Sequence, residues 1–136
     1  MNCVLCSARD NEQFRTVYED DLLWVVLNHK PIHEMHVMIL PVRHIENWNE
    51  LTSEESVAMM NMFDRCMHFF EKESGNGVNC VINSWKFRTQ EHLHAHIIPN
   101  EHGAGRYSDE FLSSGKRSLA DEKLQEKLTK ELKKRF

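Results

Sequence analysis

The chain has 136 residues, of which 40% are hydrophobic and 9% aromatic, a size and composition that fit one compact domain with its own core. Its 17 basic and 21 acidic residues give a formal net charge of −4, so the domain has no general electrostatic attraction for a nucleic-acid polymer, although a small phosphate ligand needs only a few local donors. Its longest uncharged apolar runs are too short to span a bilayer, and its N-terminus has no signal-peptide pattern.

The first part of the chain predicts three short strands. Phe14 to Glu19 reads as the first strand, and Leu22 to Asn28 as a stronger one, because it is nearly continuous in apolar, β-forming side chains. This second strand ends before Pro31, since proline has no backbone N–H to donate to a sheet. His36 to Leu40 predicts the third strand, which is closed by Pro41.

A long helix and two more strands follow. Thr52 and Glu55 fit a capping box at the start of the helix. An apolar stripe at helical spacing predicts its buried side, namely Val57, Met60, Phe63, Met67 and Phe70. Gly75 to Gly77 ends the helix and turns the chain. Val78 to Asn83 and His92 to Ile98 then predict the fourth and fifth strands, with Pro99 stopping the fifth.

The C-terminal part predicts a loop and a second helix. Residues 101–116 are polar and contain glycine, and residues 119–136 carry a narrow stripe of Leu124, Leu128 and Leu132. Five strands and two helices in the order β-β-β-α-β-β-α predict an α+β fold class with a five-stranded antiparallel sheet. We expect a single domain over residues 1–136, with its core in about residues 3–99 and a loop and helix in 100–136.

The four cysteines fall into two kinds. Cys66 and Cys80 lie among apolar neighbours, and we expect both to be small buried hydrophobic residues. Cys3 and Cys6 form a C-x-x-C pair that no apolar pattern explains, which leaves a zinc half-site, a redox pair or chance. The lack of a thioredoxin-like strand-to-helix pattern favours a metal. Few cysteines and no signal peptide favour a reducing, cytoplasmic compartment.

Three histidines alternate with apolar residues from His92 to His96. Side chains on a strand alternate between its faces, so we expect the three imidazoles to share one face. The outer two would lie about 13 Å apart along a strand, whereas zinc–nitrogen bonds are only about 2 Å long, so one ion does not fit all three rings. A neutral imidazole flanked by hydrogen-bond donors suits nucleophilic attack at phosphorus.

The run from His92 to Ile98 resembles the signature of the histidine triad (HIT) superfamily, in which three histidines alternate with apolar residues. The segments Asn28 to Pro31, His36 to His44 and Leu51 to Glu55 also resemble that family. The resemblance covers the chain from about Cys3 to Pro99. It implies an antiparallel sheet with two helices, usually in a homodimer that joins two sheets.

The resemblance also implies an activity, that of a nucleotide hydrolase or nucleotidyl transferase. Its substrates would be purine nucleotides or dinucleotides, as dinucleoside polyphosphates or nucleoside phosphoramidates. His94 would attack the α-phosphate and form a covalent nucleotidyl-histidine, and His96 would bind the phosphate and assist the leaving group. The expected nucleotide-binding residues are Asn28, which would hold the ribose hydroxyls, His36, Asn83 and Gln90.

One segment departs from the family pattern. Residues 84–91 form a shorter loop than in most members, with no glycine, and Gln90 stands two residues before His92 rather than four. Because of this departure, the resemblance assigns neither a definite role to Gln90 nor a preferred leaving group. Two other interpretations therefore stay open: a non-enzymatic nucleotide-binding or zinc-stabilised interaction protein, and a metal-dependent hydrolase that uses two of the triad histidines.

Some family members carry zinc, and the resemblance supplies a possible ligand set. Cys3 and Cys6 would give one half of the site, and His44 and His92 match the positions that complete it. Four protein ligands fill a tetrahedron and leave no position open, so this zinc would be structural. It would hold the N-terminus against the segment that carries the triad.

Overall fold

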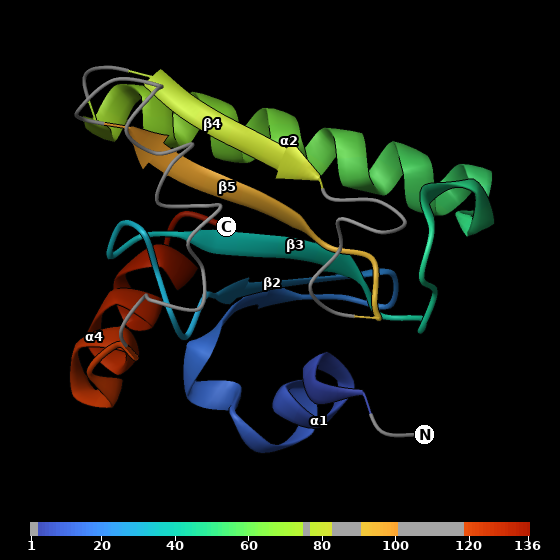
Figure 1. The fold of residues 1–136 in the computed structure, drawn as a ribbon. Coiled ribbons are helices and arrows are strands. Elements are labelled where there is room, and N and C mark those ends of the chain that lie inside the picture. The colour runs from blue at the N-terminus through green and yellow to red at the C-terminus, as the bar shows by residue number, and fades with distance from the viewer. Residues whose placement is uncertain (1–2, 75–76, 83–90, 101–118) are drawn as a thin grey trace.

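The computed structural model in Figure 1 describes residues 3–74, 77–82, 91–100 and 119–136. Its centre is a five-stranded antiparallel sheet in the order β1-β2-β3-β5-β4. The strands are β1 (Thr16–Glu19), β2 (Leu23–Leu27), β3 (Val37–Pro41), β4 (Gly77–Ile82) and β5 (Ala95–Asn100). The α-helices of the described residues are α1 (Val4–Asn11), α2 (Ser53–Ser74) and α4 (Glu122–Lys133). The predicted α+β class and the antiparallel sheet are confirmed.

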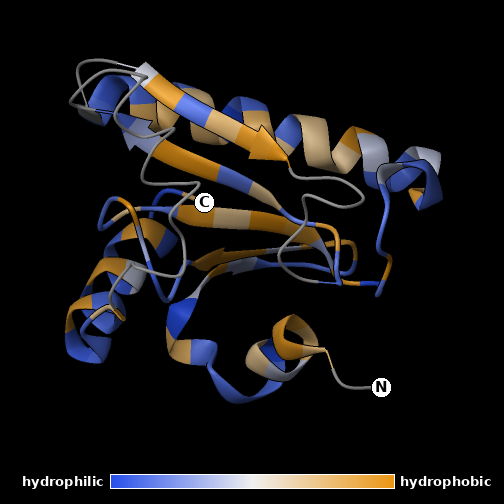
Figure 2. Ribbon diagram, in the orientation of Figure 1, coloured by the Kyte–Doolittle hydropathy of each residue, from blue (hydrophilic) through white to orange (hydrophobic). Residues whose placement is uncertain are grey.

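Hydrophobic side chains of β2 and β3 alternate between two cores, one on each face of the sheet. On one face Val25 and Ile39 pack with buried residues of α2 and α4. On the other face Trp24 and Met38 pack with residues of α1. Figure 2 shows hydrophobic residues following one another along β3, as expected for a central strand that is buried on both faces.

Helix α1 was not predicted, and it covers part of the second face. It buries only two of its residues, Leu5 and Ala8, so its sequence carries a weak apolar pattern. Its start depends on a sulfur atom, since Cys3 is the N-cap and its Sγ accepts a hydrogen bond from the Cys6 backbone N–H at 3.3 Å. A C-x-x-C pair thus begins the helix much as a serine or threonine cap would.

The predicted buried sides of the helices are only partly right. Phe63 and Phe70 are buried, but Val57 and Met60 are 61% and 57% exposed. The buried side of α2 is rotated from the predicted one and includes Met59, Met62, Phe63, Cys66 and Phe70. In α4, Leu128 and Leu132 are buried, whereas Leu124 is exposed and Gln125 and Thr129 take buried positions.

Two predictions about strands need correction. Cys66 is buried as expected, but Cys80 is exposed, because β4 is an edge strand of the sheet. Strand β5 starts at Ala95 and runs through Pro99 to Asn100, so two of the triad histidines precede it. The pairing of β3 with β5 ends at Ile97, so Pro99 has a neighbouring strand on one side only and its missing N–H is tolerated.

Among the described helices, none is long and apolar enough to cross a membrane.

The capping box at the start of α2 is present and is tied to the segment after β3. The Thr52 N–H donates to Glu55 Oε1 at 2.8 Å, and the Glu55 N–H donates to Thr52 Oγ1 at 3.1 Å. Arg43 donates to both carboxylate oxygens of Glu55, at 2.7 and 3.1 Å. This buried carboxylate therefore fixes the segment that also carries His44.

Replacing this carboxylate should lower stability in a pH-dependent way. The hydrogen bonds from Arg43 hold the pKa of Glu55 below its ordinary value of 4.5. The stabilisation is therefore present above pH 4.5 and is lost as the pH falls through the lowered pKa of the folded state. Glu55→Gln should reduce the free energy of unfolding by about 1–2 kcal/mol at neutral pH. Denaturant unfolding measures this loss.

The matched control is Glu54→Gln, which changes an exposed glutamate one residue earlier and should have little effect. The difference between Glu55→Gln and the wild type should shrink as the pH is lowered below 4.5. A loss of the same size at every pH would contradict this account.

Candidate functional site

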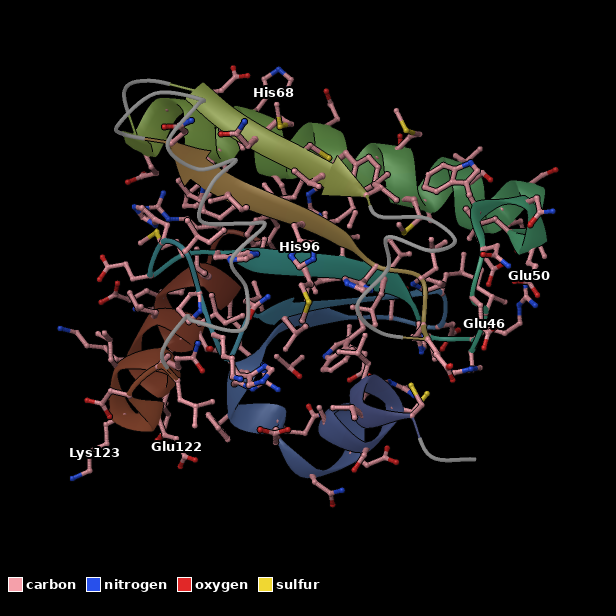
Figure 3. All side chains as sticks on the ribbon, viewed as in Figure 1. Glu46, Glu50, His68, His96, Glu122 and Lys123 are labelled. Carbon is pink, nitrogen blue, oxygen red and sulfur yellow. The ribbon has the colours of Figure 1, made fainter. Side chains whose placement is uncertain are left out.

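Four buried histidines lie where β5 and its preceding segment meet β3. His36, His92, His94 and His96 are each at most 4% exposed, which is unusual for ionisable side chains. His96 stands opposite Met38 in the register of β5 and β3, and Figure 3 shows its ring over the middle of the sheet. His36 directly precedes β3. The fold therefore brings together residues that are up to 60 positions apart in the sequence.

The His94 ring is held in one orientation by the backbone. Its Nδ1 lies 2.7 Å from the carbonyl oxygen of His92, which can only accept, so Nδ1 carries the proton. Burial lowers the pKa of His94 below its ordinary value, which keeps the ring neutral near pH 7. A neutral ring with its proton on Nδ1 has a lone pair on Nε2 and is a nucleophile.

A chain of hydrogen bonds fixes the proton of the neighbouring His96. The backbone N–H of Ile32 donates to His36 Nδ1 at 3.1 Å, so a neutral His36 carries its proton on Nε2. His36 Nε2 lies 2.8 Å from His96 Nδ1, which therefore accepts and leaves the proton of His96 on Nε2. The His94 and His96 ring centroids are 4.9 Å apart. The Nε2 lone pair of His94 and the Nε2–H of His96 thus belong to neighbouring rings.

The third triad histidine belongs to a different group, a cluster of Cys3, Cys6, His44 and His92. The ligand atoms of these four residues all lie within 4.8 Å of one another. His92 Nδ1 is 3.6 Å from Cys3 Sγ and 3.4 Å from Cys6 Sγ, and His44 Nδ1 is 3.6 Å from Cys6 Sγ. The cluster joins the start of α1, the segment after β3 and the segment before β5.

The cluster fits a tetrahedral metal ion. Zinc–sulfur bonds of about 2.3 Å and zinc–nitrogen bonds of about 2.0 Å place tetrahedral sulfur and nitrogen ligands about 3.5 Å apart, close to the observed distances. His92 Nε2 lies 2.8 Å from the Pro41 carbonyl oxygen, so Nε2 carries the proton and Nδ1 is left as a ligand atom. Burial and the neighbouring Cys3 raise the pKa of the Cys6 thiol to about 11, and a bound cation would favour the thiolate.

Asn28 is the other predicted site residue that the structure describes. It is buried at the end of β2, and its backbone N–H donates to the His36 carbonyl oxygen at 2.8 Å. Its side-chain Oδ1 accepts from the Lys30 N–H at 2.9 Å, an Asx turn that fixes the amide group. The two remaining predicted nucleotide contacts, Asn83 and Gln90, lie outside the described residues.

Sequence reasoning missed two buried side chains beside Asn28. Gln125 of α4 donates to the Asn28 carbonyl oxygen at 2.7 Å, and Arg15 donates to the Leu27 carbonyl oxygen at 2.6 Å. The sequence carries no signal for the first of them. Gln125 lies next to the apolar stripe of α4, where polar residues are expected to face solvent.

Comparison with known proteins identifies relatives of this chain. The family model for the HIT domain matches residues 9–103. An uncharacterized HIT-like protein of Methanocaldococcus jannaschii is 28% identical over 106 residues, which cover 76% of this chain and 82% of that protein. The bis(5'-adenosyl)-triphosphatase of Dictyostelium discoideum is 31% identical over 96 residues, which cover 68% of this chain and 62% of the enzyme. This chain thus aligns with less than two thirds of that relative's length.

A solved structure shares the fold over almost the whole chain. A zinc-bound histidine triad family protein from Mycobacterium smegmatis superposes with a TM-score of 0.72 at 24% sequence identity. The superposition covers 98% of this chain and 94% of that protein. The five-stranded sheet and its helices therefore form a known architecture.

Proposed function

The chain belongs to the HIT domain family, and we propose that it is a nucleotide hydrolase or nucleotidyl transferase that attacks an α-phosphate through His94. The observation that carries this proposal is the His94 ring, which is buried, neutral and held by the His92 carbonyl with its Nε2 lone pair available. A relative named as a bis(5'-adenosyl)-triphosphatase supports the class of substrate. We infer that the substrates are dinucleoside polyphosphates or nucleoside phosphoramidates.

The proposed reaction has two steps. His94 Nε2 forms a bond to the α-phosphorus, and the bond from phosphorus to the leaving group breaks. His96 Nε2–H donates a hydrogen bond to the oxygen atoms that gain negative charge. Water or another acceptor then bonds to phosphorus, and the electron pair of the His94 N–P bond returns to Nε2. The first step releases the leaving group, which is the other nucleotide of a dinucleoside polyphosphate or, after it takes up a proton, the amine of a phosphoramidate. With water, the second step releases a nucleoside monophosphate and a proton.

Trapping of the intermediate tests the proposal. The chain is mixed with an excess of a diadenosine polyphosphate or an adenosine phosphoramidate, quenched in denaturant without acid, and analysed by mass spectrometry. The expected adduct is one adenylyl group on the peptide that contains His94. Nucleotide binding with neither an adduct nor turnover would favour a non-enzymatic binding protein. Turnover that is lost when free metal is chelated would favour a metal-dependent hydrolase.

We also propose that Cys3, Cys6, His44 and His92 hold a structural zinc ion. Support comes from the short distances between the four ligand atoms and from the hydrogen bond that presents His92 Nδ1 to the sulfur atoms. A zinc-bound protein with the same fold is consistent with this metal. With four protein ligands the ion would supply cross-linking rather than an open position for a substrate.

None of the four cysteines forms a disulfide, which suits a reducing compartment, and we propose the cytoplasm.

We propose that two chains form a homodimer through the edge strand β4. Support comes from large apolar side chains that are exposed on β4 and on α2, namely Ile82, Val57 and Met60. An exposed edge strand with apolar neighbours is expected to pair with another strand. Light scattering of the purified chain should give twice the mass of 16.1 kDa. A monomer at micromolar concentration would contradict the proposal.

A further inference from the structure

Three consecutive backbone carbonyls at the end of β2 each accept a hydrogen bond from outside the sheet. Arg15 Nη1 donates to the Leu27 oxygen at 2.6 Å, and Gln125 Nε2 donates to the Asn28 oxygen at 2.7 Å. The backbone N–H of Ala120 donates to the His29 oxygen at 2.8 Å. The donors come from both ends of the chain and meet at the residues where the strand becomes the loop of residues 28–36.

This arrangement fixes the backbone of Asn28 from both sides. Its N–H donates to the His36 carbonyl, and its own carbonyl accepts from Gln125. The direction of its side chain is set by this backbone and by the Asx turn with Lys30. We therefore expect a change in the Gln125 contact to alter the orientation of the Asn28 amide group.

We propose that Gln125 is a positioning residue, which orients Asn28 for contact with the ribose hydroxyls of a bound nucleotide. The inference rests on the proposed function, and it assigns a role at the nucleotide site to helix α4. Gln125 is 3% exposed, and a buried amide destabilises a protein unless it is hydrogen-bonded. Leu128 and Leu132 already provide the apolar packing of α4, so a buried glutamine is not needed for that packing.

The same helix offers a matched control. Thr129 lies one turn after Gln125 and is 2% exposed, and among the described residues its Oγ1 has no hydrogen-bond partner. Thr129→Val keeps the shape of the side chain and removes a hydroxyl that makes no hydrogen bond within the part of the chain that the structure describes. Gln125→Met keeps the length of the side chain and removes the donor to the Asn28 carbonyl. The two variants thus change similar buried positions, and only one of them should affect the nucleotide site.

The test measures binding of AMP and of 2′,3′-dideoxy-AMP by calorimetry. Gln125→Met should weaken AMP binding about five- to tenfold, the size expected for one lost hydrogen bond. It should change dideoxy-AMP binding less than about twofold, because that ligand lacks the hydroxyls that Asn28 would contact. Thr129→Val should leave the affinity for both ligands unchanged. Equal losses for both ligands, or no loss for AMP, would overturn the inference.

Two further variants show whether a negative result contradicts the role of Asn28 or only the role of Gln125. Asn28→Ala should weaken binding of AMP but not of dideoxy-AMP; if it does not, the ribose role of Asn28 in the proposed function is wrong. If Asn28→Ala behaves as expected and Gln125→Met has no effect, only the role of Gln125 is wrong. Gln125→Leu also removes the donor to the Asn28 carbonyl, so it serves as the second variant if Gln125→Met does not fold. Thermal unfolding of each variant checks the fold.

Discussion

The variant His94→Asn is expected to lose turnover of a diadenosine polyphosphate by at least about 10⁴-fold, the scale typical for removal of a nucleophile. Asparagine fits the space of the ring and has an amide N–H that can reach a nearby carbonyl, but it has no basic nitrogen to bond phosphorus. The variant should therefore fold normally and still bind nucleotide. Release of adenosine phosphates, measured by chromatography, gives the rate, and thermal unfolding checks the fold.

His68→Asn is the matched control for this variant. His68 lies on the outer side of α2, pointing away from the sheet in Figure 3, and its side chain is 78% exposed. The same substitution there should leave turnover within about twofold of the wild type, as for most surface changes. Turnover by His94→Asn at the rate of the wild type or of His68→Asn would reject His94 as the nucleophile.

The sheet could be predicted because each strand carries its own local signal. The apolar run of β2 and Pro41 at the end of β3 mark two strands whose formation depends little on distant contacts. The rotation of α2 could not be predicted in the same way. Adjacent apolar stripes such as Val57 with Met60 and Met59 with Met62 have the same helical spacing, and only packing against the sheet selects the buried one.

The site depends more strongly on long-range contacts. The family resemblance groups His92 with Cys3, Cys6 and His44, and the structure brings the ligand atoms of these four residues within 4.8 Å of one another. His94 lies beside His96. The proton positions come from backbone groups, such as the Pro41 carbonyl and the Ile32 N–H, that leave no trace in residue identity. Gln125 was missed for the same reason, because its partner is a carbonyl 97 positions away.

Removal of a ligand from the cysteine cluster is expected to be the most destabilising change outside the core. The cluster joins three segments that are far apart in the sequence, and helix α1 has few buried apolar residues to hold it on the sheet. Metal binding to such a cluster contributes directly to folding. Cys6→Ser should lower the melting temperature by about 10 °C or more, which corresponds to a loss of roughly 3 kcal/mol. Calorimetry measures the melting temperature, and elemental analysis measures the zinc content.

Cys80→Ser is the control, because Cys80 is exposed on β4 and lies outside the cluster. It should keep about one zinc ion per chain, as expected for a closed four-ligand site. Cys6→Ser should hold less than half as much, and its turnover should also fall. The reason is that the His92 carbonyl that orients His94 belongs to a residue of the cluster. Wild-type chain that folds and melts normally without metal, or Cys6→Ser that keeps its zinc, would contradict the structural role of the ion.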